Sequence, residues 1–436
     1  MRNYEEYIDS GIDWVGFVPS NWRQTQLKYI SSISKGRKAK EEFQDFNEGM
    51  IPYLSTEYLR SQTESPFFVF ADDPNIVLVE EQDLLMLWDG YKAGEIVKAK
   101  KGALSSTMSK IHVQSELFDL NYLQYYLKNA ERYIQANTVG IGIPYVSSEV
   151  LKSLYITIPK KEEQTKIAQY LDNQTSIIDQ LILRKEKLVE LLKEKRQAVI
   201  NEAVTKGLNP SAKMKDSGIV WLKKIPKHWK VSFLKRFCFK VMDGAHFSPI
   251  TEFEGRNYIS VKDVDEFGNI DLVNCKKISQ ADFDNLVRNG CQPNIGDVLL
   301  TKDVSISRSA VVTNNDFVAL SSLGILSPNI KILDADYLRL FLISGINVEQ
   351  MFSLNVGAAL KGLTIDKMKH LVVTLPPLDE QLKIVSLVKE KIKTFDFTID
   401  LSMSQIEKFK EYRQSVISET VTGKIDVRNW QPNKNK

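Results

Sequence analysis

The residues that could perform chemistry on a nucleic acid do not form a catalytic motif. Residues 375–378 read Leu-Pro-Pro-Leu, with the two prolines of an adenine methyltransferase motif but neither the polar residue before them nor the aromatic residue after them. Residues 140–142 read Gly-Ile-Gly without the third glycine of a dinucleotide-binding loop, and Pro144 would interrupt the helix that must receive the pyrophosphate. Neither segment predicts a cofactor site.

The remaining candidates for phosphate binding, metal binding or nuclease chemistry are isolated from one another. Gly423 and Lys424 are followed by Ile425 and lack the loop that cradles a phosphate. Glu95 and Lys98 do not have the Glu-x-Lys spacing common in nucleases, and no cysteine–histidine ligand spacing occurs. The four histidines are scattered: His112, His228, His246 and His370. We therefore expect no metal site and no cofactor held by the chain itself, and catalysis is the weaker interpretation.

Basic residues gather in two places that suit contact with phosphate groups. The first is a short cluster: Lys35, Arg37, Lys38 and Lys40. The second runs from Lys206 to Arg236 and holds nine lysines and arginines against one acidic residue. Such surfaces give affinity for nucleic acid but carry no sequence information. The formal net charge of +3 is too small to decide the matter, and a solvated lysine-rich linker explains the second run equally well.

The elements that would position these residues are present twice. The block at residues 159–205 recurs at 376–422, so that Gln381 lies 217 residues after Gln164. The opening block Asp-Ser-Gly-Ile-x-Trp at residues 9–14 recurs at 216–221, which is an offset of 207. Between the blocks the two halves differ. We call the matched blocks of each half its frame. Two similar frames that hold two dissimilar inserts predict a scaffold that presents two different recognition surfaces, or readers.

The matched blocks read as long helices, from about residue 160 to 205 and from about 378 to 422. Neither contains proline, and Gly207 and Gly423 follow them, as glycine often does at helix ends. About 45 residues would extend for roughly 65 Å at about 1.5 Å per residue.

Each long helix has an apolar stripe of the kind that packs against one main partner helix. In the first, steps of four and three residues predict the stripe Ile167, Leu171, Gln174, Ile178, Leu181, Lys185, Leu188, Leu192, Lys195 and Val199. In the second, the predicted stripe is Val385, Val388, Ile392, Phe395, Ile399, Ser402, Ile406, Phe409, Arg413 and Val416. Two amphipathic helices of one ordinary core are the alternative.

The inserts have the pattern of small α+β domains. Short β-prone runs separated by Asp, Pro and Gly occupy residues 50–115 and 256–332. Each insert then passes into a shorter predicted helix, at about 119–136 and about 334–351. We therefore expect two α+β domains of related fold and unlike surfaces, each leading into a long helix.

Composition sets the broad class of the protein. A chain of 436 residues can form two or three domains, and 43% apolar with 26% charged residues is ordinary for a soluble protein. No run approaches the roughly 18 apolar residues that span a membrane, and the first residues lack the apolar core of a signal peptide. We therefore expect no membrane partner. The three cysteines form no CxxC pair, so we expect reduced thiols in a cytoplasmic protein.

Taken together, these features resemble the DNA specificity subunit of type I restriction–modification systems. The resemblance covers nearly the whole chain and rests on Pro-x-x-x-Glu-Gln-x-x-Ile entering each long helix, at residues 159–167 and 376–384. It also rests on Arg-Gln-x-Val-Ile near each helix end and on the opening blocks. Residues 243–249, Asp-Gly-Ala-His-Phe-Ser-Pro, resemble a segment common at the start of this family's recognition domains. The first half departs from it with Lys-Gly-Arg-Lys at residues 35–38.

The resemblance implies a subunit without catalytic residues of its own. Two target recognition domains would each read one half of a bipartite site in double-stranded DNA, and the paired long helices would fix the distance between them. Methyltransferase subunits would dock on the chain, and restriction (motor-nuclease) subunits would join them. S-adenosylmethionine, ATP and Mg are expected only in those partner subunits. Since the frame occurs twice, it predicts two methyltransferase subunits per chain.

A pseudo-two-fold internal repeat has geometric consequences. Tandem repeats related by such an axis suit paired half-sites on duplex DNA, and an axis perpendicular to the helices makes them antiparallel. The predicted fold class is thus α+β, with two target recognition domains separated by two long helices that form an antiparallel coiled coil. Phosphate contacts would set the register and side chains at base edges would choose the sequence. We expect half-sites about one helical turn apart.

The expected domain boundaries follow the repeat. They are 1–158 for the first recognition domain with its opening block, 159–206 for the central helix, 207–375 for the second recognition domain, 376–424 for the C-terminal helix and 425–436 for a tail. The opening-block tryptophans are expected to anchor each domain to the helices by packing: Trp14, Trp22, Trp221 and Trp229.

Candidate DNA readers are polar residues near Gly or Ser turns and off the apolar periodicity. In the first domain they are Lys35, Arg37, Lys38, Tyr91, Lys92, Ser105 and Ser106. In the second they are His246, Lys302, Ser305, Ser307, Arg308 and Lys361. For each of them, ordinary loop polarity is the alternative. Four frame residues are candidates either for docking a partner or for holding the helices: Gln164, Arg196, Gln381 and Arg413.

Two other functions compete with a non-catalytic reader. A self-sufficient DNA-modifying enzyme would methylate DNA as the purified chain alone. A coiled-coil scaffold would bind no DNA specifically, which a mobility-shift assay of the partner complex would reveal.

Overall fold

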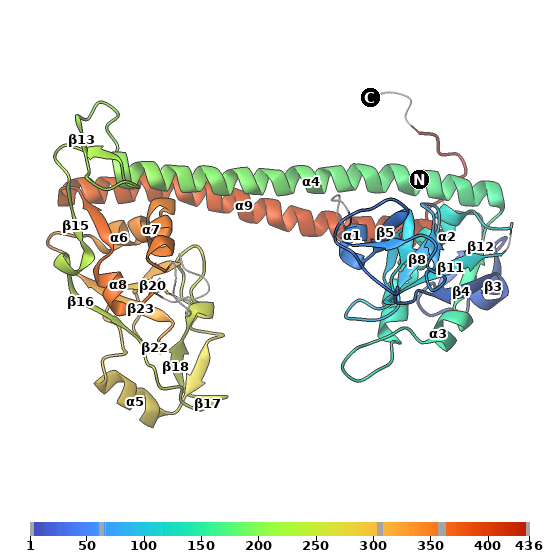
Figure 1. Ribbon diagram of the computed structural model, residues 1–436, viewed down its shortest axis with the longest axis horizontal. Helices are drawn as coiled ribbons and strands as arrows, with labels where there is room; N and C mark the ends of the chain where they lie inside the picture. The colour runs from blue at the N-terminus through green and yellow to red at the C-terminus, as the bar shows by residue number, and fades with distance from the viewer. Residues whose placement is uncertain are drawn as a thin grey trace. The chain divides into compact units, whose positions relative to one another are not determined.

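The computed structural model describes residues 4–60, 65, 67–114, 116–302, 308–355 and 363–432. The chain divides into two compact units (Figure 1). Unit 1 consists of Met1–Arg184 and Gln405–Lys436, and unit 2 of Lys185–Ser404. Each unit therefore holds one of the two inserts together with part of both long helices.

The two long helices are present where the periodicity predicts them. Helix α4 spans Lys161–Lys206 and helix α9 spans Leu378–Val421. The glycine beyond each helix has a positive φ, 72° at Gly207 and 76° at Gly423. Because side chains disfavour this conformation, glycine ends both helices in the same way.

The described residues of unit 1 form two four-stranded sheets and two two-stranded ladders. Its helices are α1 (Thr56–Arg60), α2 (Leu120–Ala136), α3 (Ser148–Ser153) and the 3-10 turn η1 (Leu27–Tyr29). Its strands are β1 (Tyr7–Asp9), β2 (Phe17–Pro19), β3 (Arg23–Gln26), β4 (Ser31–Lys35), β5 (Met50–Leu54), β6 (Phe68–Phe70), β7 (Leu78–Val79), β8 (Leu84–Leu87), β9 (Ile96–Lys98), β10 (Gly102–Leu104), β11 (Met108–Val113) and β12 (Tyr155–Ile158). The sheets are β4-β11-β8-β9, which is antiparallel, and β6-β5-β10-β7, in which β5 and β10 are parallel.

Unit 2 repeats this plan. Its helices are α5 (Gln280–Arg288), α6 (Ala335–Leu342), α7 (Gly345–Asn355), α8 (Ile365–Lys369), η2 (Leu234–Arg236) and η3 (Val261–Asp263). Its strands are β13 (Met214–Asp216), β14 (Lys224–Pro226), β15 (Lys230–Phe233), β16 (Cys238–Asp243), β17 (Thr251–Glu252), β18 (Arg256–Ile259), β19 (Lys276–Ile278), β20 (Val298–Thr301), β21 (Ser309–Val311), β22 (Phe317–Ala319), β23 (Leu323–Pro328) and β24 (Val372–Leu375). The antiparallel sheet is β16-β23-β20-β21, and the second sheet is β17-β19-β18-β22 with β18 and β22 parallel.

The units differ around this common plan, as the unmatched inserts predict. The order of the outer strands in the second sheet is different, and the place of the single helix α2 is taken by two helices, α6 and α7. Helix α5 follows β19 and has no counterpart among the described helices of unit 1. The prediction of two α+β domains of related fold is confirmed.

Both long helices contribute to the core of each unit. In unit 1, Ile167 and Leu171 of α4 share a buried cluster with Val416 and Ile417 of α9 and with Trp22. In unit 2, Ile200 and Val204 of α4 cluster with Ile384 and Val388 of α9 and with Trp229. The four tryptophans lie in or against these cores, where packing anchors are expected.

The predicted stripe of α9 consists of buried or partly buried residues throughout, but the predicted stripe of α4 is partly wrong. Leu181, Leu188 and Lys195 are exposed, whereas the residues that follow them, Ile182, Val189 and Arg196, are partly buried. Apolar residues stand side by side at the first two of these points, so that two phases of the helix look equally apolar in sequence.

Among the described helices, none is both long and apolar enough to cross a membrane. Cys238, Cys275 and Cys291 are free thiols, and burial raises the pKa of Cys238 to about 12.

Candidate nucleic-acid interface

In unit 1 the predicted readers meet where strands of the antiparallel sheet end. Lys35 ends β4, and its ammonium lies 2.9 Å from the Asp89 carboxylate and 5.9 Å from the centre of the Trp88 ring. A Cβ on Gly36 would lie 2.0 Å from the Ser105 carbonyl oxygen, so only glycine lets the two segments approach this closely.

A short loop completes this surface. Val139 and Tyr145 exchange backbone hydrogen bonds of 3.0 and 2.8 Å. The Gly90 N–H donates to the Pro144 carbonyl at 2.8 Å, and the N–H of Val146 donates to the Trp88 carbonyl at 2.9 Å. We call residues 35–38, 88–92, 105–107 and 139–145 the unit 1 face.

The predicted side chains of the unit 1 face differ in accessibility. Arg37, Lys38, Tyr91 and Lys92 are exposed, Tyr91 to 93%. The Ser105 side chain is buried, with its hydroxyl 3.1 Å from that of the exposed Thr107. Ser106 is partly buried and forms hydrogen bonds with Tyr53, which oppose the rise in the Tyr53 pKa caused by burial. Thr107, which is not among the predicted readers, is therefore better placed to contact a ligand than either serine.

In unit 2 the equivalent strand end carries a cluster of three charged or polar groups. The Asp243 carboxylate accepts a hydrogen bond of 2.7 Å from the Lys302 ammonium, and the same oxygen lies 3.0 Å from His246 Nε2. Lys302 is only 8% exposed, whereas the His246 ring faces solvent. Lys302 thus fixes Asp243, and His246 is the member of the cluster that a ligand can reach.

The other predicted readers of the second domain are placed only in part. The Arg308 guanidinium donates to the Val264 carbonyl at 3.2 Å, and its backbone N–H donates to the Thr301 hydroxyl at 3.0 Å. Ser305, Ser307 and Lys361 lie outside the described residues. We call residues 243–248, 302 and 308 the unit 2 face.

The two faces carry reversed charges at the same position of their sheets. Lys35 lies opposite Ser109, the second residue of β11, and Asp243 lies opposite Gly324, the second residue of β23. The ionic partner of each follows the strand on the far side of that neighbour. Asp89 lies two residues after β8 and Lys302 one residue after β20, so the partners do not stand at equivalent positions. The cation therefore stands at the strand end in unit 1, and the anion stands there in unit 2. One repeated frame thus places opposite charges at the same strand end, Lys35 in unit 1 and Asp243 in unit 2.

The glutamine at the start of each long helix forms hydrogen bonds that hold the helix start to the preceding backbone. Gln164 Nε2 donates to the carbonyls of Leu117 (3.0 Å) and Pro159 (2.9 Å), and its Oε1 accepts from the Asp119 N–H (2.9 Å). Gln381 repeats the arrangement in unit 2 with Ile332, Pro376 and Asp334. Neither glutamine has any exposed surface. Of the two roles left open by the sequence, this geometry fits the holding of the helix start, because a docking protein could not reach these side chains.

The two frame arginines form equivalent ion pairs between the helices. Within unit 1, Arg413 of α9 donates to Asp179 of α4 at 2.8 Å, and within unit 2, Arg196 of α4 donates to Asp396 of α9 at the same distance. Each arginine and each aspartate lies 217 residues from its counterpart. The pair in unit 2 is the more buried, and burial raises the pKa of Asp396 although Arg196 lowers it.

These two pairs give a matched test of burial. We expect Arg196→Ala to destabilise the protein by about 2 kcal/mol, because it leaves the half-buried Asp396 carboxylate without its partner. Arg413→Ala should cost less than about 1 kcal/mol, because Asp179 stays hydrated. Urea unfolding of the two variants measures the difference, and equal losses would show that burial does not govern these pairs.

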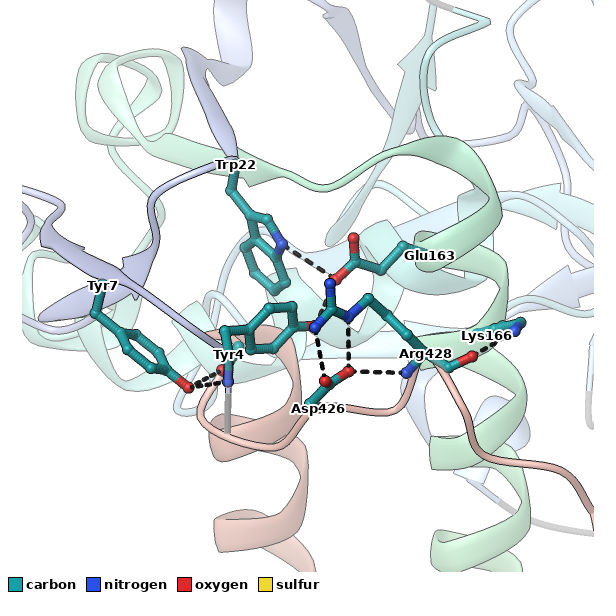
Figure 2. A network of polar contacts seen from close by, with 8 residues as sticks. Tyr4, Tyr7, Trp22, Glu163, Lys166, Asp426 and Arg428 are labelled. Atoms are coloured by element: carbon teal, nitrogen blue, oxygen red, sulfur yellow. Dashed lines mark hydrogen bonds and ion pairs between the residues drawn. The ribbon is translucent and has the colours of Figure 1, made fainter. Parts of the chain in front are cut away.

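Figure 2 shows a buried polar network in unit 1 around Glu163. The Glu163 carboxylate accepts from the Tyr4 hydroxyl and, at 3.2 Å, from Trp22 Nε1. The Arg428 guanidinium lies 2.8 Å from the Asp426 carboxylate, and its hydrogen bonds to that group lower the pKa of Asp426. The same guanidinium covers the Tyr4 ring, with its central carbon 4.6 Å from the ring centre. The segment after α9 is therefore packed against unit 1.

The equivalent residues of unit 2 form different polar contacts. Glu380 lies 2.7 Å from His228 Nε2, and the buried Nε1 of Trp229 has no hydrogen-bond partner. The two frames thus match in backbone and packing but not in every polar contact. Among the described residues, no group of three or more His, Cys, Asp or Glu could hold a metal ion.

Known proteins of one family match most of the chain. The sequence pattern of the type I restriction modification DNA specificity domain matches residues 19–191 and 226–408. The type I restriction enzyme MjaVIII specificity subunit of Methanocaldococcus jannaschii is 27% identical over 94% of this chain and 95% of its own length. The type I restriction enzyme EcoBI specificity subunit of Escherichia coli is 24% identical over 97% of this chain and 90% of its own.

The fold also has a solved counterpart. A chain from a structural study of complex assembly and conformational transition of the type I R-M system superimposes with a TM-score of 0.66. It is 14% identical, and the match covers 94% of this chain and 99% of that chain.

Proposed function

Because the chain belongs to the family of type I restriction–modification DNA specificity subunits, we propose that it reads a bipartite sequence in double-stranded DNA and catalyses no reaction itself. The unit 1 face would read one half-site and the unit 2 face the other. The observation that carries this proposal is that Lys35 in unit 1 and Asp243 in unit 2 place opposite charges at the same strand end of one repeated frame. Two identical readers would need identical faces, whereas two unlike half-sites require unlike ones.

The chemistry of the two faces suits recognition. Arg37, Lys38 and Lys92 are exposed cations that can contact phosphates and fix the register on the duplex. Tyr91, Thr107 and His246 are exposed groups that can donate or accept at base edges. Lys302 and Asp243 position His246 rather than contact DNA themselves.

The long helices would set the distance between the faces. Two contacts within unit 1 support an antiparallel course of α4 and α9. Asp179 of α4 pairs with Arg413 of α9, and Lys166, which lies earlier in α4, contacts Arg428, which lies beyond the end of α9. In unit 2, Arg196 pairs with Asp396, and the end of α4 at Gly207 approaches Glu380 near the start of α9. A continuous antiparallel coiled coil would explain both sets of contacts and would space the half-sites about one helical turn apart.

Partner subunits would supply the chemistry. The frame occurs twice, so it offers two equivalent surfaces for two methyltransferase subunits, and restriction subunits would join that complex. S-adenosylmethionine, ATP and Mg would be bound by those partners, and the complex would work in the cytoplasm.

A domain exchange tests the proposal. Residues 31–146, from β4 to the loop before α3, are replaced by the equivalent segment of a relative, and the chain is expressed with its methyltransferase partner. Mapping of N6-methyladenine in host DNA should show a two-part motif only when the chain is present, and the exchange should alter one half of that motif. The unmodified chain is the control. Methylation that persists without the chain, or a motif changed in both halves, would contradict the proposal.

A further inference from the structure

The tip of the loop in the unit 1 face is apolar and points into solvent. Ile141 is fully exposed and Ile143 is 70% exposed, with Tyr91 beside the loop's anchor also open to solvent. Figure 1 shows the chain that leads into α3 on the side of unit 1 away from α4. Single exposed apolar residues are common, but two isoleucines at one loop tip within a face of exposed cations are not explained by packing.

The loop is built to hold this shape. Gly140 and Gly142 have φ values of 109° and 101°, which side chains disfavour. A Cβ on Gly140 would lie 2.7 Å from the Ile143 carbonyl oxygen, so the turn requires glycine there. The paired backbone bonds of Val139 and Tyr145 close the loop, and the Gly90–Pro144 bond anchors it to the face. The isoleucines are therefore presented by a closed loop, and their branched side chains have few rotamers to lose on binding.

We propose that Ile141 and Ile143 enter a groove of the DNA at the half-site read by unit 1 and insert between neighbouring base pairs as an apolar wedge. The proposal rests on the function proposed above and adds a second mode of reading to it. Apolar side chains that insert in this way partly unstack a base step and kink the duplex. Because pyrimidine–purine steps unstack most readily, the wedge selects sequence through deformability, without a hydrogen bond to a base.

Charge favours DNA over protein as the partner of this loop. Arg37, Lys38 and Lys92 are exposed in the same face, and Asp89, its acidic member, is already paired with Lys35. A duplex brings phosphates to the cations and stacked bases to the isoleucines at the same time.

The test uses the complex of the full chain with its methyltransferase subunits and a duplex that carries its methylated site. 2-Aminopurine, whose fluorescence rises on unstacking, is placed at successive steps of the half-site read by unit 1. The methylated adenine is avoided, because a methyltransferase can itself extrude that base. The variant is Ile141→Ser with Ile143→Ser, and the control is Ile8→Ser, an exposed isoleucine of β1 in the same unit.

We expect a several-fold rise in fluorescence at one step with the unmodified chain and with the control. The double variant should return this signal to that of free duplex and weaken site-specific binding about tenfold. A double variant with the unmodified signal and affinity would overturn the wedge and leave DNA reading intact. Failure of the double variant alone to assemble with the methyltransferase without DNA would assign the loop to a protein contact and also overturn it. Absence of site-specific binding by the unmodified complex would instead contradict the proposed function.

Discussion

Deleting residues 182–188 from α4 together with the equivalent residues 399–405 from α9 is expected to abolish methylation at the natural site. Seven residues of helix correspond to about 10 Å, and DNA rises about 3.4 Å per base pair, so the two faces would be about three base pairs too close. A heptad deletion keeps the phase of the apolar stripe, so the helices can still pack. The loss would therefore come from spacing and not from unfolding.

Methylation of a library of duplexes, with the spacer between the half-sites shortened or lengthened one base pair at a time, measures this effect. We expect at least a hundredfold loss at the natural spacer, and any recovered activity should fall on shorter spacers. In the matched control, residues 182–188 are replaced by a copy of 175–181 and residues 399–405 by a copy of 392–398, which preserves the length. An unchanged preference for the natural spacer after the deletion would show that the helices do not set the distance.

The long helices could be predicted from sequence because their signals are local and repeated. The stripe of α9 follows Val385 and Val388 without an error of phase. In α4 the choice between Leu181 and Ile182, and between Leu188 and Val189, cannot be made from apolar character alone. The offset of 217 residues contains the missing information, since it maps Ile399 onto Ile182 and Ile406 onto Val189. A repeat is thus a guide to packing phase as well as to domain organisation.

The candidate faces could be predicted only in part, because their contacts depend on strand order. Lys35, Lys302 and His246 were recognisable as polar residues near turns. Their partners Asp89 and Asp243 were not, because β4 and β8 are separated in the sheet by β11, which comes later in the chain. Neither the order of the strands nor their register follows from one sequence. The opposite charges of Lys35 and Asp243 at the equivalent strand end become apparent only when both sheets are known.

Replacing Gln164 with alanine should destabilise the protein by about 2–4 kcal/mol. The substitution removes three hydrogen bonds from a site without solvent access, and the Asp119 N–H and the Pro159 carbonyl lose the amide that satisfies them. The effect should extend beyond the site, since Asp119 also caps the first turn of α2 by accepting from the N–H groups of Asn121 and Tyr122. Urea unfolding of the chain gives the change in free energy.

The repeat supplies both a replicate and a control for this prediction. Gln381→Ala should cost the same as Gln164→Ala, because Gln381 makes the same three bonds around the start of α9. Gln169→Ala, at an exposed position five residues further along α4, should change the free energy of unfolding by less than about 0.5 kcal/mol. If Gln164→Ala were as mild as Gln169→Ala, the glutamine would not hold the helix start. Its burial in both units would then need another cause, since a docking partner cannot reach it in either.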